Sequence, residues 1–167
     1  MGENASTTTP LPERLLPSPR RSALVTGAAR RIGAAIARRL HAAGYDLALH
    51  YRDSEADMQA LAAELEAARP GSTRVLQADL AQFDRLPELV AKTVGHFGRL
   101  DALVNNAGVL ETQMRLDCMD AARVRRVLDA NVVGPLLCCR EAVRRMSTRH
   151  GGQGGAIVNV SSVAALT

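Results

Sequence analysis

Short apolar runs alternate with longer amphipathic stretches along most of this chain. The apolar runs predict five strands, at residues 23–25, 46–51, 74–77, 100–104 and 156–160. The stretches between them repeat apolar residues at helical spacing and predict helices, at about residues 32–43, 54–68, 87–97 and 119–146. Such alternation is typical of a parallel sheet covered by helices, because every parallel connection needs a crossover. The pattern predicts the α/β class, with a doubly wound parallel sheet that binds ligands at the carboxyl ends of its strands.

Residues 1–21 break this pattern. They hold four of the seven prolines and a Ser/Thr run, so they cannot keep a helix or a ladder of hydrogen bonds. We expect a disordered leader there and a single domain at residues 22–167. Aromatic residues make up only 2% of the chain, so the core of that domain must be built from Ala, Val, Leu and Ile.

Composition narrows the classes of partner. The net charge of +4 comes almost wholly from arginine, and two Phe and two Tyr are too few stacking groups for a nucleic-acid site. No apolar run approaches the roughly 20 residues of a membrane span, and the N-terminus lacks the apolar stretch of a signal peptide. We therefore expect a cytoplasmic protein that binds neither nucleic acid nor membrane. Three cysteines without Cys-x-x-Cys spacing predict reduced core thiols and no metal site: Cys118, Cys138 and Cys139.

The first predicted strand leads directly into a glycine turn, which begins at Thr26-Gly27 and ends at Gly33. A strand, a glycine turn and a helix N-terminus form a phosphate-binding device, because backbone N–H groups can approach a pyrophosphate and the helix start favours an anion. The spacing is not Gly-x-Gly-x-x-Gly, and no Gly-Lys-Ser/Thr follows, which excludes a P-loop. A tight connection without a ligand is the plain alternative. The flanking strand and helix favour a dinucleotide site.

Charges near the second strand favour NADP(H) over NAD(H). An NAD site places a carboxylate at the end of this strand, about 20 residues past the turn, to accept the ribose 2′-OH. Here Tyr51 occupies that place and Arg52 follows it. The guanidinium groups of Arg30, Arg31 and Arg52 can hold a 2′-phosphate through paired charge-assisted hydrogen bonds. The alternative is a solvated basic rim, which Asp53 partly neutralises.

Polar motifs follow the later strands as well. They are Asp79-Leu80, Asn105-Asn106-Ala107-Gly108, Asn131 within the long helix, and Ser161-Ser162 at the fifth strand. Together with Thr26-Gly27-x-x-x-Arg31-x-Gly33, these motifs resemble the short-chain dehydrogenase/reductase family over residues 22–167. The stretch 26–52, in which Arg31 replaces the family's middle glycine, is most similar to the pteridine-reductase-like branch.

This resemblance implies a Rossmann-type fold with the strand order 3-2-1-4-5. It also implies an NADP(H)-dependent oxidoreductase that acts on a small-molecule carbonyl or alcohol. In the family, the residue at Ser162 hydrogen-bonds the substrate carbonyl, and the residue at Asn131 holds a water for proton relay. Considered without the family, Asn131 would satisfy a buried carbonyl and Ser162 would be an ordinary polar residue at a strand end.

The predicted cofactor-binding residues lie at the ends of the first four strands. The resemblance implies that Asp79 and Leu80 flank the adenine, and that 106–108 line the adenosine cleft. Alternatively, Asp79 caps the following helix and 106–108 form a turn. The complete predicted set is Thr26, Gly27, Arg30, Arg31, Ile32, Gly33, Tyr51, Arg52, Asp79, Leu80, Asn106, Ala107 and Gly108.

The proton donor that the family uses has no counterpart among these residues. Reduction of a carbonyl leaves an oxyanion that an acid must protonate. The family uses a tyrosine with a lysine four residues later, but Tyr45 is followed at that interval by Leu49, and Tyr51 by Glu55. The only lysine, Lys92, has no such partner. We therefore expect an incomplete Rossmann domain that lacks the C-terminal part of the family fold and has lost turnover.

Two alternatives stay open. One is a non-catalytic nucleotide-binding or interaction protein, and the other is a fragment that is active only when its C-terminal half complements it. Without a sixth strand, the fifth strand would present an unpaired edge, which is a template for pairing with another chain. The apolar face of the long helix would also stay exposed. We expect homo-oligomerisation or association through the edge strand.

Overall fold

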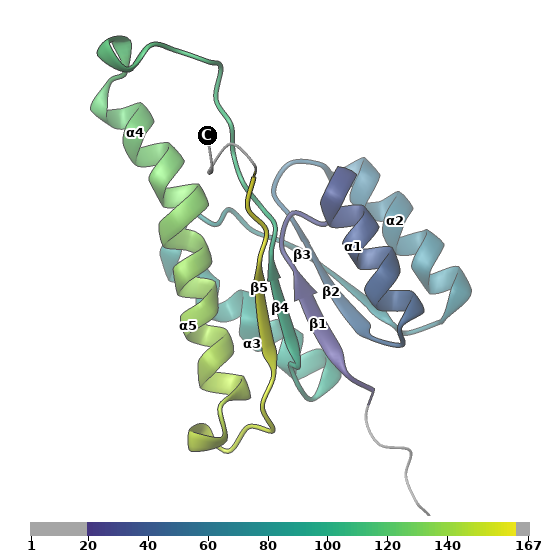
Figure 1. The fold of residues 1–167 in the computed structure, drawn as a ribbon. Helices are drawn as coiled ribbons and strands as arrows, with labels where there is room; N and C mark the ends of the chain where they lie inside the picture. Colours follow the sequence, from purple (N-terminus) through teal and green to yellow (C-terminus); the bar gives the residue numbers. More distant parts are fainter. Residues whose placement is uncertain (1–19, 163–167) are drawn as a thin grey trace, which may run out of the picture.

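The computed structural model describes residues 20–162, which form one five-stranded sheet (Figure 1). All neighbouring strands are parallel, and their order is β3-β2-β1-β4-β5. The chain runs outward from the central β1 on one side and then returns to build the other side. This confirms the predicted doubly wound sheet and places a crevice between the carboxyl ends of β1 and β4. The strands are β1 (Ser22–Val25), β2 (Asp46–Tyr51), β3 (Thr73–Gln77), β4 (Ala102–Asn105) and β5 (Ala156–Asn159).

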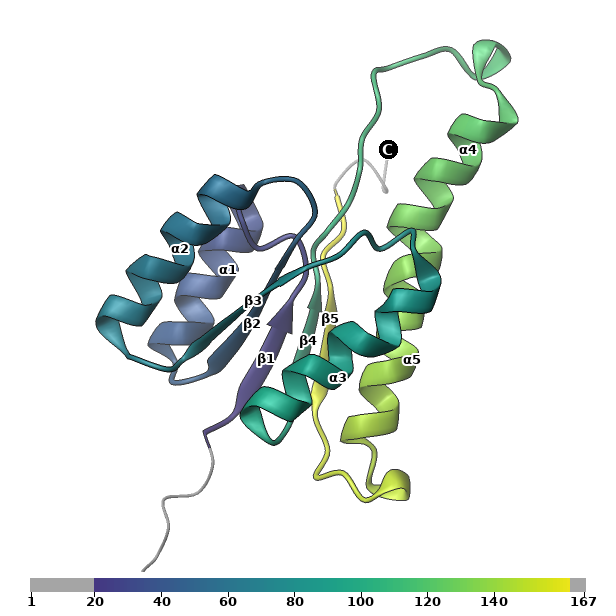
Figure 2. The same ribbon diagram turned by 180° about the vertical axis from the view of Figure 1, so that it is seen from behind.

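Helices cover both faces of the sheet (Figure 2). On one face lie α1 (Arg31–Ala42) and α2 (Glu55–Ala68), and on the other lie α3 (Leu86–Phe97) and α5 (Gly134–Met146). The long helix that the sequence predicts begins two residues late, with α4 (Ala121–Leu128). It then passes through a π-helical segment (Asp129–Val133) before α5. Short 3₁₀ turns occupy Phe83–Arg85, Leu116–Cys118 and Thr148–His150.

The core has two halves, separated by the sheet. Every residue of β1, β2 and β4 is buried, which explains why these strands are near-continuous apolar runs. Side chains alternate between the faces: Val25 packs into the half beneath α1 and α2, and Leu24 packs into the half beneath α3 and α5. Cys138 lies in the second half, but Cys118 is exposed, so the prediction of a core thiol is wrong for Cys118.

The fifth strand lies at the edge of the described sheet, and most of its residues are exposed. Val158 on this strand keeps 51% of its surface exposed. The helical stretch from α4 to α5 also leaves apolar side chains exposed at intervals of one or two turns. This surface, called the α4/α5 stripe below, consists of Val124, Leu128, Val132, Leu136 and Val143.

The predicted leader lies outside the described residues except at its last two positions, and both of these contact the domain. Arg20 Nε donates to an Asp46 carboxylate oxygen at 3.0 Å, and the Arg21 guanidinium lies 4.5 Å from the centre of the Tyr45 ring. Between residues 20 and 162, no helix combines the length and the apolar character that crossing a membrane requires.

Candidate cofactor site

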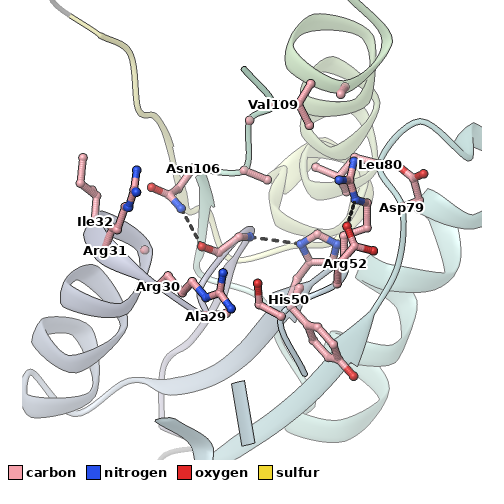
Figure 3. A pocket seen from close by; sticks show the side chains of 18 residues that line it. Ala29, Arg30, Arg31, Ile32, His50, Arg52, Asp79, Leu80, Asn106 and Val109 are labelled. Carbon is pink, nitrogen blue, oxygen red and sulfur yellow. Dashed lines mark hydrogen bonds and ion pairs between the residues drawn. The ribbon is translucent and has the colours of Figure 1, made fainter. Parts of the chain in front are cut away.

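A pocket of about 400 Å³ lies at the carboxyl edge of the sheet (Figure 3). Its lining comes from the turn after β1, the end of β2 with the residues that follow it, the segment after β3, the loop after β4 and Ala130 of the π-helical segment. All of the predicted cofactor residues except Thr26 line this pocket. Six other residues line it that the sequence did not predict: Ala29, His50, Asp53, Ser54, Val109 and Ala130.

Two glycines allow the turn after β1 to pack closely against its neighbours. Gly27 has a φ of +63°, and a Cβ there would lie 2.8 Å from Ala107 Cα. A Cβ on Gly33 would lie 2.2 Å from the carbonyl oxygen of Gly27. Because no side chain fits at either position, the first turn of α1 stands directly against the backbone of the turn. This leaves the N-terminus of α1 open toward the pocket, where an anion is favoured.

Thr26 lies below the pocket surface and connects two of the segments that form the site. Its side chain is buried, and its hydroxyl oxygen accepts hydrogen bonds from the backbone N–H groups of Asn106 and Ala107, both at 3.0 Å. The Asn106 side chain donates in return to the carbonyl oxygens of Thr26 and Gly27, at 3.0 and 2.9 Å. Thr26 therefore joins the turns after β1 and β4, and it contributes nothing to the pocket surface.

The three predicted arginines differ in their partners. Arg30 pairs with Asp57 on α2 at 2.5 Å, and Arg52 pairs with its neighbour Asp53 at the same distance. Within residues 20–162, Arg31 forms no ion pair or side-chain hydrogen bond, and its φ is +49°. This is the left-handed region, which glycine adopts without strain and other residues rarely adopt. Arg31 thus presents an unpaired guanidinium from a strained backbone.

The end of β2 carries an aromatic ring and an imidazole. Tyr51 is buried, and no carboxylate stands at this last position of the strand. His50 precedes it, and burial lowers the pKa of the imidazole to about 4. Ser54 is the N-cap residue of α2 and makes no capping hydrogen bond with its side chain. The signal that could have found His50 and Ser54 is their position at the carboxyl end of β2 and before a helix.

The segment after β3 forms a compact turn. The Asp79 carboxylate accepts a hydrogen bond from the Ala81 backbone N–H at 2.9 Å, which makes an Asx-type turn and not a cap of the later helix. Leu80 is buried beside Gly134, where a Cβ would lie 2.7 Å from the Leu80 carbonyl oxygen. Asp79 and Leu80 nevertheless line the pocket.

Asn131 lies in the π-helical segment beside the pocket. Its side chain accepts from the Val109 N–H at 2.7 Å and donates to the Val109 carbonyl at 2.9 Å, so it holds the loop after β4. Its partner is thus the backbone of a pocket-lining residue. Ser162 follows the end of β5 and does not line the pocket. No group of His, Cys, Asp and Glu that could hold a metal occurs in the part of the chain that the structure describes.

Comparisons with known proteins agree with this geometry. A family model described as short chain dehydrogenase matches residues 21–167. The chain is 46% identical to the uncharacterized oxidoreductase YgfF of Escherichia coli over 142 residues, which cover 85% of this chain and 57% of YgfF. It is 40% identical to human 15-hydroxyprostaglandin dehydrogenase (NAD(+)) over 144 residues, which cover 86% of this chain and 51% of that protein.

A solved structure is similar as well. A short chain dehydrogenase from Burkholderia cenocepacia in complex with NADP superposes with a TM-score of 0.80 at 37% identity, over 87% of this chain and 57% of the other. The chain therefore spans little more than half the length of the proteins that it matches.

Proposed function

Because the chain belongs to the short-chain dehydrogenase family, we propose that these residues form the NADP(H)-binding part of an oxidoreductase for small carbonyl or alcohol substrates. A bound nicotinamide would supply or accept a hydride. The observation that carries the proposal is the arginine-lined pocket beside a glycine turn that opens a helix. The Gly27 and Gly33 backbone and the N-terminus of α1 would hold the pyrophosphate.

The balance of charge around the end of β2 supports NADP(H) over NAD(H). Arg30 and Arg52 are paired with Asp57 and Asp53, whereas Arg31 has no ion pair in the described part of the chain. Asp79, the other carboxylate that lines the pocket, bonds the Ala81 N–H and no arginine, so the guanidinium of Arg31 is the cation left for a ligand. Both ion pairs are exposed, and exposed pairs contribute only about 0 to 1 kcal/mol. A 2′-phosphate can therefore replace the carboxylates at little cost. The relatives include one protein named for NAD(+) and another complexed with NADP, so the proposed preference for NADP(H) rests on the charges of this chain.

The proton donor is the part that this chain does not supply. Tyr45 lies next to Arg21 and makes no contact with the pocket, and Tyr51 is buried at the end of β2. Lys92 lies on α3 and pairs with Glu88 at 2.8 Å. None of these groups can form the tyrosine–lysine pair that carbonyl reduction uses in the family. We therefore propose that the 167-residue chain binds the cofactor without turnover, and that Asn131 and Ser162 act only together with a tyrosine and a lysine from a further segment.

Titration of the chain with NADPH and NADH, followed by nucleotide fluorescence, tests the cofactor assignment. We expect NADPH to bind at least ~10-fold more tightly, which corresponds to about 1.4 kcal/mol. Tighter binding of NADH, or no binding of either nucleotide, would refute it. A carbonyl-reduction assay with and without a separate segment that carries Tyr-x-x-x-Lys tests the rest, because turnover by the chain alone contradicts the proposal.

A non-catalytic nucleotide-binding or interaction protein is the second candidate. The observation that favours it is the combination of the exposed edge strand β5 with the α4/α5 stripe, since exposed edges and apolar patches are typical of surfaces that associate. NADPH binding without turnover in every complementation assay would support this candidate over the first.

A further inference from the structure

His50 lines the pocket, and Figure 3 shows its ring bonded to the glycine turn. Only 1% of its surface is exposed. On one side, Nδ1 lies 3.2 Å from the backbone nitrogen of Gly27, in the glycine turn. On the other side, Nε2 lies 3.0 Å from the carbonyl oxygen of Ala78, which directly precedes Asp79. A single imidazole therefore joins the turn to the segment after β3.

The partners of the ring determine its tautomer. A backbone N–H can only donate, so Nδ1 must accept the hydrogen bond from Gly27. A carbonyl oxygen can only accept, so Nε2 must carry the hydrogen that is donated to Ala78. The ring is therefore neutral and protonated on Nε2. A second proton would have to enter on Nδ1, where it would face the N–H of Gly27.

The backbone of His50 strengthens the same attachment. Its carbonyl oxygen accepts a hydrogen bond from the Ala28 N–H at 2.9 Å. Two successive N–H groups of the turn, those of Gly27 and Ala28, are thus bonded to one residue of β2. They keep the turn in the conformation that needs a positive φ at Gly27, and they leave the N–H groups further along the turn for a ligand. Order that exists before binding lowers the entropic cost of binding.

We propose that His50 is a positioning residue of the cofactor site, whose neutral imidazole holds the glycine turn against the segment after β3. This inference rests on the proposed function for its effect on cofactor affinity. It does not make His50 an acid or base, because both ring nitrogens are occupied by backbone partners.

The charged groups around His50 must be the same in the natural chain and in the variants that test its role. Asp79 acts on the ring from the segment after β3 and favours the protonated form, but burial outweighs it and keeps the pKa low. The other charged side chains that line the pocket are Arg30, Arg31, Arg52 and Asp53. They stay unchanged in a His50 variant, so a difference between the variant and the natural chain reports on the imidazole.

Three substitutions separate the two hydrogen bonds. His50→Asn keeps an acceptor near the Nδ1 position, His50→Gln keeps a donor near the Nε2 position, and His50→Leu keeps neither. We expect His50→Leu, which loses both hydrogen bonds, to weaken NADPH binding by ~10-fold or more, and His50→Asn, which loses one, by ~5-fold or less, since each lost hydrogen bond costs about 1 kcal/mol. The matched control is His41→Asn. His41 is also buried and bonds Ser72 at 2.7 Å, but it does not line the pocket, so this change should leave NADPH affinity within ~2-fold.

Two further measurements distinguish positioning from mere stabilisation. First, because the pKa of His50 is about 4, NADPH affinity of the natural chain should fall more steeply between pH 5.5 and pH 4 than that of folded His50→Asn. Second, nitrogen chemical shifts of the ligand-free protein should show Nε2 protonated and Nδ1 unprotonated. A folded His50→Leu variant with natural NADPH affinity, or a ring protonated on Nδ1, would overturn the inference. If the natural chain binds neither nucleotide, the proposed function fails, and the nitrogen shifts still decide whether His50 holds the turn.

Discussion

The side-chain amide nitrogen of Asn106 lies 2.9 Å from the carbonyl oxygen of Gly27, so the end of β4 is tied to the turn after β1. The same nitrogen also donates to the carbonyl of Thr26. A Cβ on Gly33 would lie only 2.6 Å from this amide. One side-chain amide thus connects the two segments that border the crevice between the carboxyl ends of β1 and β4.

Replacing the Asn106 amide by a carboxylate tests this tie. In Asn106→Asp, an acceptor faces two carbonyl oxygens and both hydrogen bonds are lost, so we expect unfolding free energy to fall by about 1–3 kcal/mol at pH 7. Urea unfolding followed by circular dichroism measures the change. Gln59→Glu, the same chemical change on the exposed face of α2, should stay within ~0.5 kcal/mol of the natural chain. Equal stability of the two variants would contradict the role of Asn106.

A methyl group at Gly33 should disrupt the site, because it would meet the Gly27 carbonyl at 2.2 Å. We expect Gly33→Ala to lose about 1–3 kcal/mol of stability through overpacking and to lose measurable NADPH binding. Gly95→Ala is the control: it lies within α3, and a Cβ there would meet no atom within 4 Å. That change should stabilise the chain by about 0.5–1 kcal/mol. Calorimetry and fluorescence titration measure both effects, and a Gly33→Ala variant that still binds NADPH would exclude the close approach.

Arg31→Gly should change stability and affinity in opposite directions. Glycine removes the strain of the positive φ, worth about 1 kcal/mol, while the loss of the guanidinium should weaken NADPH binding more than NADH binding. The ratio of the two dissociation constants is the decisive quantity. Arg125→Ala removes an equal charge from the exposed side of α4 and should leave the ratio unchanged. The same fall in affinity for both nucleotides would show that Arg31 does not hold the 2′-phosphate.

His50 should make the stability depend on pH. Its pKa is about 4 in the folded chain and 6.5 in the unfolded chain, so between these values the unfolded state binds more protons. The contribution is complete above pH 6.5 and is lost as the pH falls toward 4, to a total of about 3 kcal/mol. Urea unfolding at pH 7 and pH 4.5 should therefore show a larger loss for the natural chain than for His50→Asn. Equal losses would mean that the ring is not held neutral.

The α4/α5 stripe should drive self-association of the chain. Leu136 lies in its middle with 63% of its surface exposed, so Leu136→Arg should reduce association without a large loss of stability. Sedimentation velocity over a range of concentrations measures this effect. Leu110 is more exposed, at 96%, but lies outside the helices, and Leu110→Arg serves as the control. A natural chain that stays monomeric at high concentration would contradict this prediction.

Most of the architecture was predictable because burial on both faces demands long apolar runs. The fully buried strands β1 and β2 occur close to where those runs predicted them, and β4 is shifted by one or two residues. The glycine turn was also predictable, since strand, turn and helix follow one another along the chain. The π-helical segment was not, because an amphipathic pattern cannot show where one extra residue enters a helical turn.

The candidate site also contains features that the sequence predicted and features that it did not. Residues at strand ends could be assigned to the pocket because parallel strands end at one edge of a sheet. The pairing of Arg30 with Asp57, the burial of the Thr26 hydroxyl and the double attachment of His50 could not be predicted. Thr26 and Asn106 stand 80 residues apart in the chain, and only the packing of β1 against β4 brings them together. Local sequence thus encodes which segments become strands and turns, whereas the partner of each polar group depends on which distant segments pack side by side.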